Sequence, residues 1–297
     1  MLVRSFEYRA PASVGEACKF LSEHPEDSRP LAGGQSLIPL MRLNLVELRY
    51  LVDLKRIESL RLVSVQEQGE DVAACELSIG SMVTHDEIEH NETIRKHAPL
   101  LSETARSIGH PLVRNRGTIG GSVSHCDPSA DYCASLLTLD ASVVLASVGG
   151  TRTLPCQEFF VGPFTTAIAK GEIVESIRIP INSSGTRTHS FKKLSLGHGS
   201  FPLVVVSVSI ERSGNSLDKI RIGLAGVSDK AIRAVQAERL FTESFGKEAI
   251  QACIQKAAAT VERECNPSDD LEVSGEYKRK MAVVLTRRAL TQALGEQ

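Results

Sequence analysis

The sequence predicts an α+β protein built in two blocks, and three observations lead to this class. Helical and strand patterns are mixed through the first 180 residues, as in sheets covered by helices. A polar, turn-rich stretch at residues 182–186 follows a proline and is the best linker candidate. Beyond it, strand patterns precede helical ones, which is typical of an α+β module. We therefore expect one block at residues 1–180 and a second at residues 187–297.

The first block begins with a small α/β unit. Residues 13–22 predict a helix, because Ser13 and Glu16 match a capping box and apolar residues recur at helical spacing. Residues 29–32 predict a strand that runs into a glycine pair, followed by a loop or helical turn at residues 35–41. This order of elements presents backbone N–H groups to an anion. Residues 51–54 predict the next strand and complete a first subdomain at about residues 1–58.

A second subdomain is expected at about residues 59–180. Two strands, at residues 62–65 and 76–79, are predicted around a polar turn at 68–71. A hairpin around residue 149 has strands at residues 142–147 and 151–154, and a last strand lies at residues 172–179. Thr84 and Glu87 match another capping box, and the helix that begins at Pro99 should stop at Gly109. A further helix can start at Asp127-Pro128.

The second block is simpler. Three strands at residues 190–194, 203–211 and 219–225 predict an antiparallel meander with a turn at residues 213–215. Three helices should follow, at about residues 230–243, 246–264 and 275–294.

Composition excludes several functional classes. The chain has 297 residues and a net charge of −2, without the basic block of a nucleic-acid or membrane-surface binder. No apolar run could span a bilayer and the first residues do not resemble a signal peptide, so we expect a cytoplasmic protein. The seven cysteines include no CxxC pair, so we expect neither a metal site nor a disulfide framework in this chain.

Two glycine-rich stretches carry the functional prediction. The first contains Gly33-Gly34 and the second is residues 114–121, with three glycines, two arginines and a threonine. Neither has the spacing of a Rossmann fingerprint or a Walker A loop. A glycine pair alone is usually a plain turn. Two such pairs, each flanked by strands and beside a Ser or Thr, could together surround a dinucleotide pyrophosphate with N–H and O–H donors. Arg114 and Arg116 either add charge there or are simply solvated.

These stretches resemble a known family. Residues 32–43 and 114–122 resemble the first and second flavin loops of the FAD-binding subunits of molybdenum hydroxylases, most closely the medium subunit of the carbon monoxide dehydrogenase and xanthine dehydrogenase group. The resemblance covers essentially the whole chain. It implies a two-subdomain FAD-binding domain of the PCMH or vanillyl-alcohol-oxidase-like type, followed by a C-terminal domain of antiparallel sheet and helices.

The resemblance also implies which residues bind FAD. Gln35 stands where relatives often have His or Thr, and Ser122 where they usually have Asn or Asp. Asp131 would accept a hydrogen bond from flavin hydroxyls, or alternatively place a charge at a helix N-terminus. Ile173 and Val174 would contact the isoalloxazine, although both also read as ordinary strand core. The implied FAD-binding residues are Ala32, Gly33, Gly34, Gln35, Ser36, Leu37, Ile108, Gly109, Gly117, Thr118, Ile119, Gly120, Gly121, Ser122, Asp131, Ile173, Val174 and Lys192.

The implied role is electron transfer within a complex. Substrate would be oxidised at a molybdopterin cofactor in a large subunit, and electrons would pass through two [2Fe-2S] clusters of a small subunit to FAD and then to NAD or a quinone. A dimer of such heterotrimers is expected, without an additional [4Fe-4S] loop in this chain. We find no catalytic acid–base pair, and His125 and Cys126 are candidates for tuning the flavin. Two alternatives are a stand-alone FAD-dependent oxidoreductase of the same fold and an assembly subunit that has lost FAD.

Overall fold

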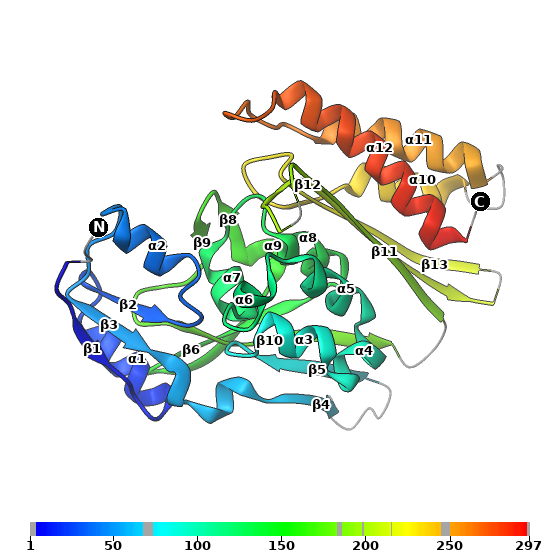
Figure 1. The fold of residues 1–297 in the computed structure, drawn as a ribbon. Coiled ribbons are helices and arrows are strands. Elements are labelled where there is room, and N and C mark those ends of the chain that lie inside the picture. Colours follow the sequence, from blue (N-terminus) through cyan, green and yellow to red (C-terminus); the bar gives the residue numbers. More distant parts are fainter. Residues whose placement is uncertain are drawn as a thin grey trace.

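The structure is a computed structural model that describes residues 4–67, 74–182, 186–197, 199–214, 216–244 and 250–295. A small N-terminal sheet, a central sheet covered by helices and a C-terminal sheet with its own helices follow one another across the molecule (Figure 1). Among the described residues, no helix has the length and apolar character needed to cross a membrane.

The N-terminal sheet is parallel, and its strand order is β1–β3–β2. Parallel strands require crossover connections, which are supplied here by one helix after β1 and a short one after β2. Ser13 caps the first helix by accepting a hydrogen bond from the Glu16 N–H. Strand β1 was not predicted from the sequence. The elements are β1 (Glu7–Arg9), α1 (Val14–Glu23), β2 (Ser28–Leu31), α2 (Leu37–Arg42) and β3 (Tyr50–Asp53), followed by the 3₁₀ turns η1 (Leu54–Arg56) and η2 (Glu58–Arg61).

The central sheet is antiparallel in the order β4–β5–β10–β6–β7. Its middle strand, β10, is the last of the five in the chain. The strands are β4 (Val63–Glu67), β5 (Ala74–Gly80), β6 (Ser142–Ser147), β7 (Gly150–Pro155) and β10 (Ile173–Asn182). One large apolar core joins this sheet to the helices above it. The covering elements are α3 (His85–His90), α4 (Glu92–His97), α5 (Pro99–Ser107), α6 (Pro111–Arg114), α7 (Ile119–His125), α8 (Asp131–Thr138), α9 (Cys156–Phe159), β8 (Phe160–Gly162) and β9 (Thr165–Thr166).

The C-terminal part is a four-stranded antiparallel sheet with three helices on its outer face (Figure 1). Helix α8 of the central part contacts the opposite side, against β12 and β13. A second apolar core fills the space between sheet and outer helices. The elements are β11 (Thr186–Ser195), β12 (Pro202–Ser213), β13 (Ser216–Ala225), β14 (Ile232–Arg233), α10 (Val235–Ser244), α11 (Ile250–Glu264) and α12 (Gly275–Leu294).

Two predicted helix starts need correction. The helix expected from residue 230 begins at Val235, because Ile232 and Arg233 form strand β14 beside β13. The helix expected at Asp127 begins at Asp131, since the Asp127 carboxylate instead accepts from the Ser129 N–H in a turn. The predicted turns at residues 68–71 and 213–215, the linker at 182–186 and the start of the helix at 246–264 fall partly or wholly outside the described residues.

Candidate functional site

The two glycine-rich stretches meet backbone to backbone. A Cβ atom placed on Gly33 would lie 2.0 Å from the Arg116 carbonyl oxygen and 2.7 Å from the Gly117 Cα. A Cβ on Gly121 would lie 3.4 Å from the Ala32 side chain. Only a residue without a side chain allows this approach at position 33, so the sequence requires glycine there.

The first stretch keeps free donors in the loop that leads into α2. Gly34 has φ +72°, a conformation that glycine adopts without strain. The Ile38 N–H bonds to the Gly34 carbonyl, and the Gln35 amide donates to the Gly33 carbonyl at 3.2 Å. Ser36 precedes the first helical residue, Leu37. Within the described protein, the N–H groups of residues 33–36 donate no hydrogen bond, so they remain available to an anion.

The second stretch differs from its prediction. It is not flanked by strands, because it connects α6 to the helix α7. Thr118 caps α7 and accepts from the Gly121 N–H at 3.1 Å, and Ile119 lies in the core. Four other N–H groups are bonded within the protein: Gly117 to Val113 O, Ile119 to Val83 O, Gly120 to Ser81 O and Ser122 to Thr118 O. Among the described residues, the Thr118 N–H donates no hydrogen bond. The Thr118 hydroxyl still has a hydrogen to donate.

A buried histidine supports this second stretch from below. A Cβ on Gly117 would lie 2.6 Å from His85 Nε2, and His85 Nδ1 is 3.1 Å from the Tyr132 hydroxyl. Burial, and then the nearby Arg114 charge, lower the pKa of His85 to about 4. His85 is therefore neutral at physiological pH, and it acts as a rigid support for the second glycine-rich stretch.

The Arg114 side chain makes its contacts within the protein rather than at the surface of the loop. Its Nε is 3.1 Å from a Glu89 carboxylate oxygen, and both side chains are about 15% exposed. Its Nη1 donates to the carbonyls of Ile108 and Gly109, at 3.4 and 3.2 Å. Gly109 has φ +51°, so this turn also depends on glycine. Arg116 is exposed, and its backbone carbonyl touches Gly33.

Asp131 joins the central part to the C-terminal sheet. Its Oδ1 lies 3.1 Å from Lys193 Nζ and 3.2 Å from Ser107 Oγ. Burial raises the pKa of Asp131, and the Lys193 ammonium opposes that rise. Lys193, which the sequence analysis did not single out, is thus a functional candidate; its place next to Lys192 on a strand was the available signal.

Lys192 does not join the glycine loops. Alternate residues of a strand point to opposite faces, so Lys192 faces away from Asp131 when Lys193 faces it. The Lys192 ammonium donates to Gln292 on α12. The isoalloxazine contact expected of Lys192 stays a prediction, and the structure adds Lys193 as the lysine of this pair that faces Asp131.

Ile173 and Val174 are buried at the start of β10, in two different apolar clusters. A bulge follows Val174. There the Glu175 carbonyl accepts from the Ser81 N–H, and Ser81 O accepts from the Gly120 N–H. A Cβ on Gly120 would lie 2.4 Å from the Ser81 Cβ. Ser81, also missed from the sequence, thereby connects this strand to the second glycine stretch.

His125 and Cys126 hold the β8–β9 hairpin. The Cys126 carbonyl accepts from the Phe164 N–H, and the His125 and Phe164 rings are 5.2 Å apart. The Cys126 residue is 3% exposed, and burial raises the pKa of its thiol. The thiol is therefore protonated at neutral pH, which is typical of a structural cysteine.

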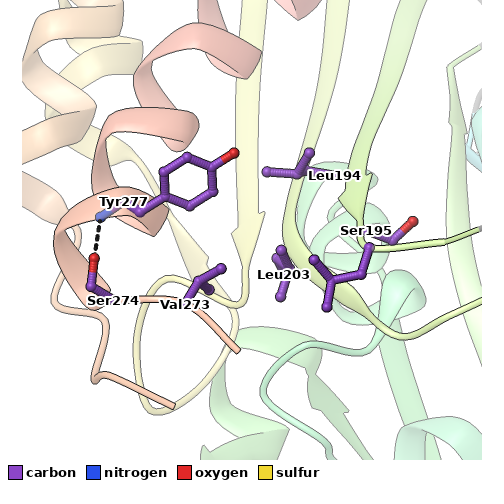
Figure 2. Close-up of a pocket in the computed structure, with 7 residues that line it drawn as sticks. Leu194, Ser195, Leu203, Val273, Ser274 and Tyr277 are labelled. Carbon is purple, nitrogen blue, oxygen red and sulfur yellow. Dashed lines mark hydrogen bonds between the residues drawn. The ribbon is translucent and has the colours of Figure 1, made fainter. Parts of the chain in front are cut away.

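The C-terminal part contains a cavity that the sequence did not indicate. It measures about 390 Å³ and lies between the end of β11, the start of β12 and the start of α12. Figure 2 shows Tyr277 and Leu194 side by side at this cavity, with Val273 and Leu203 below them. The Tyr277 N–H donates to the Ser274 Oγ that caps α12. The lining is mostly apolar, and Tyr277 carries its one titratable side chain among the described residues.

Fold and loops together define a class: a nucleotide-binding domain with paired glycine loops between two sheets, followed by an α+β domain. The sequence profile of the FAD binding domain in molybdopterin dehydrogenase matches residues 4–182, and that of the CO dehydrogenase flavoprotein C-terminal domain matches residues 189–293. The chain belongs to the family of FAD-binding medium subunits of carbon monoxide dehydrogenase and xanthine dehydrogenase type.

Individual relatives agree with this family. The chain is 36% identical to the carbon monoxide dehydrogenase medium chain of Hydrogenophaga pseudoflava, covering 99% of this chain and 98% of the relative. It is 36% identical to the glyceraldehyde dehydrogenase medium chain of Sulfolobus acidocaldarius, covering 96% of each. Among solved structures it is similar to quinoline 2-oxidoreductase from Pseudomonas putida 86, with a TM-score of 0.89, 31% identity and coverage of 99% and 98%.

Proposed function

We propose that this chain is the FAD-carrying electron-transfer subunit of a multi-subunit molybdenum hydroxylase or dehydrogenase. In this proposal a large subunit holds the molybdopterin cofactor and a small subunit holds two [2Fe-2S] clusters. The chain relays electrons from those clusters to an external acceptor, NAD or a quinone, within a dimer of heterotrimers. Several relatives support this arrangement, since they are themselves medium chains or subunits of dehydrogenases and hydroxylases.

The contact of Gly33 with Arg116 and Gly117 carries the proposal. It brings the first loop, with unbonded N–H groups at residues 33–36, beside the Thr118 hydroxyl. These neutral donors suit a diphosphate without nearby cations. When bound, FAD supplies the redox chemistry, and the protein positions it and excludes water.

The proposed binding residues follow the sequence prediction with one addition. The first loop and Thr118 would hold the diphosphate, while Gly117, Ile119, Gly120, Gly121 and Ser122 shape the second loop through their own hydrogen bonds and packing. Ile108, Gly109 and Asp131 would border the cofactor, together with the segment that begins at Ile173 and Val174. Lys193 is added to this set, because its ammonium reaches Asp131.

The decisive experiment is isolation of the native complex from its own cells. We expect the chain to purify with two partners, one larger and one smaller, and with FAD. The complex should contain about four Fe for each Mo, as two [2Fe-2S] clusters require. Addition of the organic substrate or CO should bleach the flavin absorbance in the complex but not in the isolated chain. A colourless chain without partners would contradict the proposal.

A stand-alone oxidoreductase is the second candidate, and the cavity beside Tyr277 is the observation that favours it. Turnover of an organic substrate by the purified chain alone, lost on Tyr277→Phe, would support this candidate.

Domain boundaries and location belong to the same proposal. We place an FAD-binding domain at residues 1–180 and the C-terminal domain at 187–297, and we expect limited proteolysis to cut first between them. A cytoplasmic location fits the seven unpaired cysteines, six of which are buried.

A further inference from the structure

A second cavity, of about 510 Å³, lies where β11, α11 and α12 come together. It is open to solvent, and the arginine and glutamine residues that line it are exposed. Three cations line it, Lys192, Arg287 and Arg288. The rest of the lining is neutral and polar, with a threonine hydroxyl and the side-chain amides of Gln251, Gln255 and Gln292.

Among the described residues, the three cations have no acidic partner. Within the described part of the chain, neither arginine nor Lys192 forms an ion pair. The Lys192 ammonium donates instead to Gln292 Oε1, which also accepts from Ser190 Oγ at 2.8 Å. The Lys192 charge also acts on Glu103 of α5. Burial raises the pKa of Glu103, and the positive charge of Lys192 lowers it. The Glu103 carboxylate itself pairs with His189 at 3.5 Å.

Helix geometry directs these groups into one concave surface. Arg288 and Gln292 are four residues apart on α12 and therefore share a face, as Gln251 and Gln255 do on α11. Like charges around one cavity repel one another, and a concave surface focuses their field and concentrates counter-ions there. An anion that enters would relieve the repulsion, so its binding should stabilise the folded chain.

We propose that this cavity is an anion site, separate from the flavin loops, that binds the phosphate groups of a small phosphorylated ligand. A phosphate group carries a charge of about −1.5 to −2 at neutral pH, which matches three cations better than a single carboxylate does. The planar fork of arginine also suits phosphate oxygens, and the amides can bond the remainder of the ligand. Lys192 and Lys193 point to opposite faces of β11, so this site and the proposed flavin site lie on opposite sides of that strand.

The test uses the protein with FAD bound, and pyrophosphate is the probe. Its binding is measured by isothermal titration calorimetry in phosphate-free buffer. We expect saturable binding at one site and a rise in the melting temperature. The double variant Arg287→Ala/Arg288→Ala should bind at least about tenfold more weakly, because each charged hydrogen bond contributes on the order of 1.5–3 kcal/mol. Lys280→Ala removes an exposed cation of the same helix outside the cavity, and it should bind within about twofold of the parent chain.

FAD content and a competing anion complete the design. FAD content should stay unchanged in every variant, and Arg288→Gln repeats the test with less disturbance of the helix. The proposal is overturned if binding does not saturate by about 10 mM, a concentration that corresponds to less than about 3 kcal/mol of affinity. Equal binding by the arginine variants, equal affinity for citrate, or a parallel loss of FAD would also overturn it.

Discussion

Lys193 and Asp131 form a buried ion pair between β11 and the first turn of α8, with 3.1 Å between Nζ and Oδ1. The same ammonium donates to the Ser107 carbonyl at the end of α5, at 3.0 Å. One side chain of the C-terminal sheet therefore fixes the ends of two helices of the central part. The segment Ile108–Gly109 directly follows Ser107, so this link also positions a proposed border of the flavin site.

Replacing Lys193 should destabilise the protein. Lys193→Met leaves a buried carboxylate without its cation, and we expect the free energy of unfolding to fall by about 3–5 kcal/mol at neutral pH. The loss should shrink in acid, because Asp131 can then take up a proton. Urea unfolding at two pH values measures both effects. Lys219→Met, at an exposed lysine of β13, should change stability by less than about 0.5 kcal/mol. Equal effects of the two substitutions would contradict the role of the ion pair.

Gly33→Ala should weaken FAD binding without unfolding the chain. The new methyl group would lie 2.0 Å from the Arg116 carbonyl oxygen, so the two loops must separate. We expect FAD affinity to fall by more than about tenfold, since a displaced loop loses at least one hydrogen bond to the diphosphate. Flavin absorbance after dialysis measures the loss.

Gly15→Ala is the matched control for this substitution. A Cβ at Gly15 meets nothing within 4 Å, and the residue lies in α1. This substitution should leave FAD in place and stabilise the protein by roughly 0.5–1 kcal/mol, as alanine does in a helix. Retention of FAD by Gly33→Ala at the level of Gly15→Ala would be evidence against the paired-loop site.

The two arginines of the second stretch should behave differently. Arg114→Ala leaves Glu89 largely buried without its partner, and we expect a loss of about 3–5 kcal/mol in stability. Arg116→Ala changes an exposed side chain, so stability should stay within about 0.5 kcal/mol. Chemical unfolding of both variants checks this. If Arg116→Ala instead releases FAD while stability is unchanged, Arg116 contacts the phosphate directly.

His85 should make stability fall in acid. Its pKa of about 4 in the folded chain lies below the ordinary value of 6.5. The stabilisation is therefore fully present above pH 6.5 and is lost as pH falls towards 4. The difference corresponds to about 3 kcal/mol, at about 1.4 kcal/mol for each pKa unit. Unfolding curves for the parent chain and His85→Gln between pH 7 and 4 should converge by this amount. Parallel curves would show that His85 does not titrate as the buried geometry requires.

Much of the fold could be predicted because local patterns and final structure agree. The capping box of Thr84 and Glu87 forms as expected, and the hairpin of β6 and β7 lies where alternation indicated. Strand β1 was missed because it has three residues and all of them are exposed, so it carries no apolar alternation. Strand β14 depends on its pairing with β13, which a local pattern does not reveal.

The sequence led to the two glycine loops, which the structure brings together, but their detailed contacts depend on the tertiary structure. The glycine pairs identified the two loops. The sequence could not show that the carbonyls of Val83, Val113 and Ser81 accept hydrogen bonds from N–H groups of the second one. A choice between Lys192 and Lys193 requires knowledge of which face of β11 meets α8. Pairings such as Glu89 with Arg114 join residues that are distant in the sequence, so no spacing rule reveals them.

The position of β10 has a consequence for the order of events during synthesis. This strand lies between β5 and β6 although it leaves the ribosome after both. Until residues 173–182 emerge, neither neighbour can complete its pairing, and Ser81 lacks the Glu175 carbonyl that orients it toward Gly120. Long-range pairing of this kind slows folding, because the loops must close before the contacts form. A nascent chain that stops before β10 should therefore be unable to retain cofactor, and loading must follow synthesis of the whole central sheet.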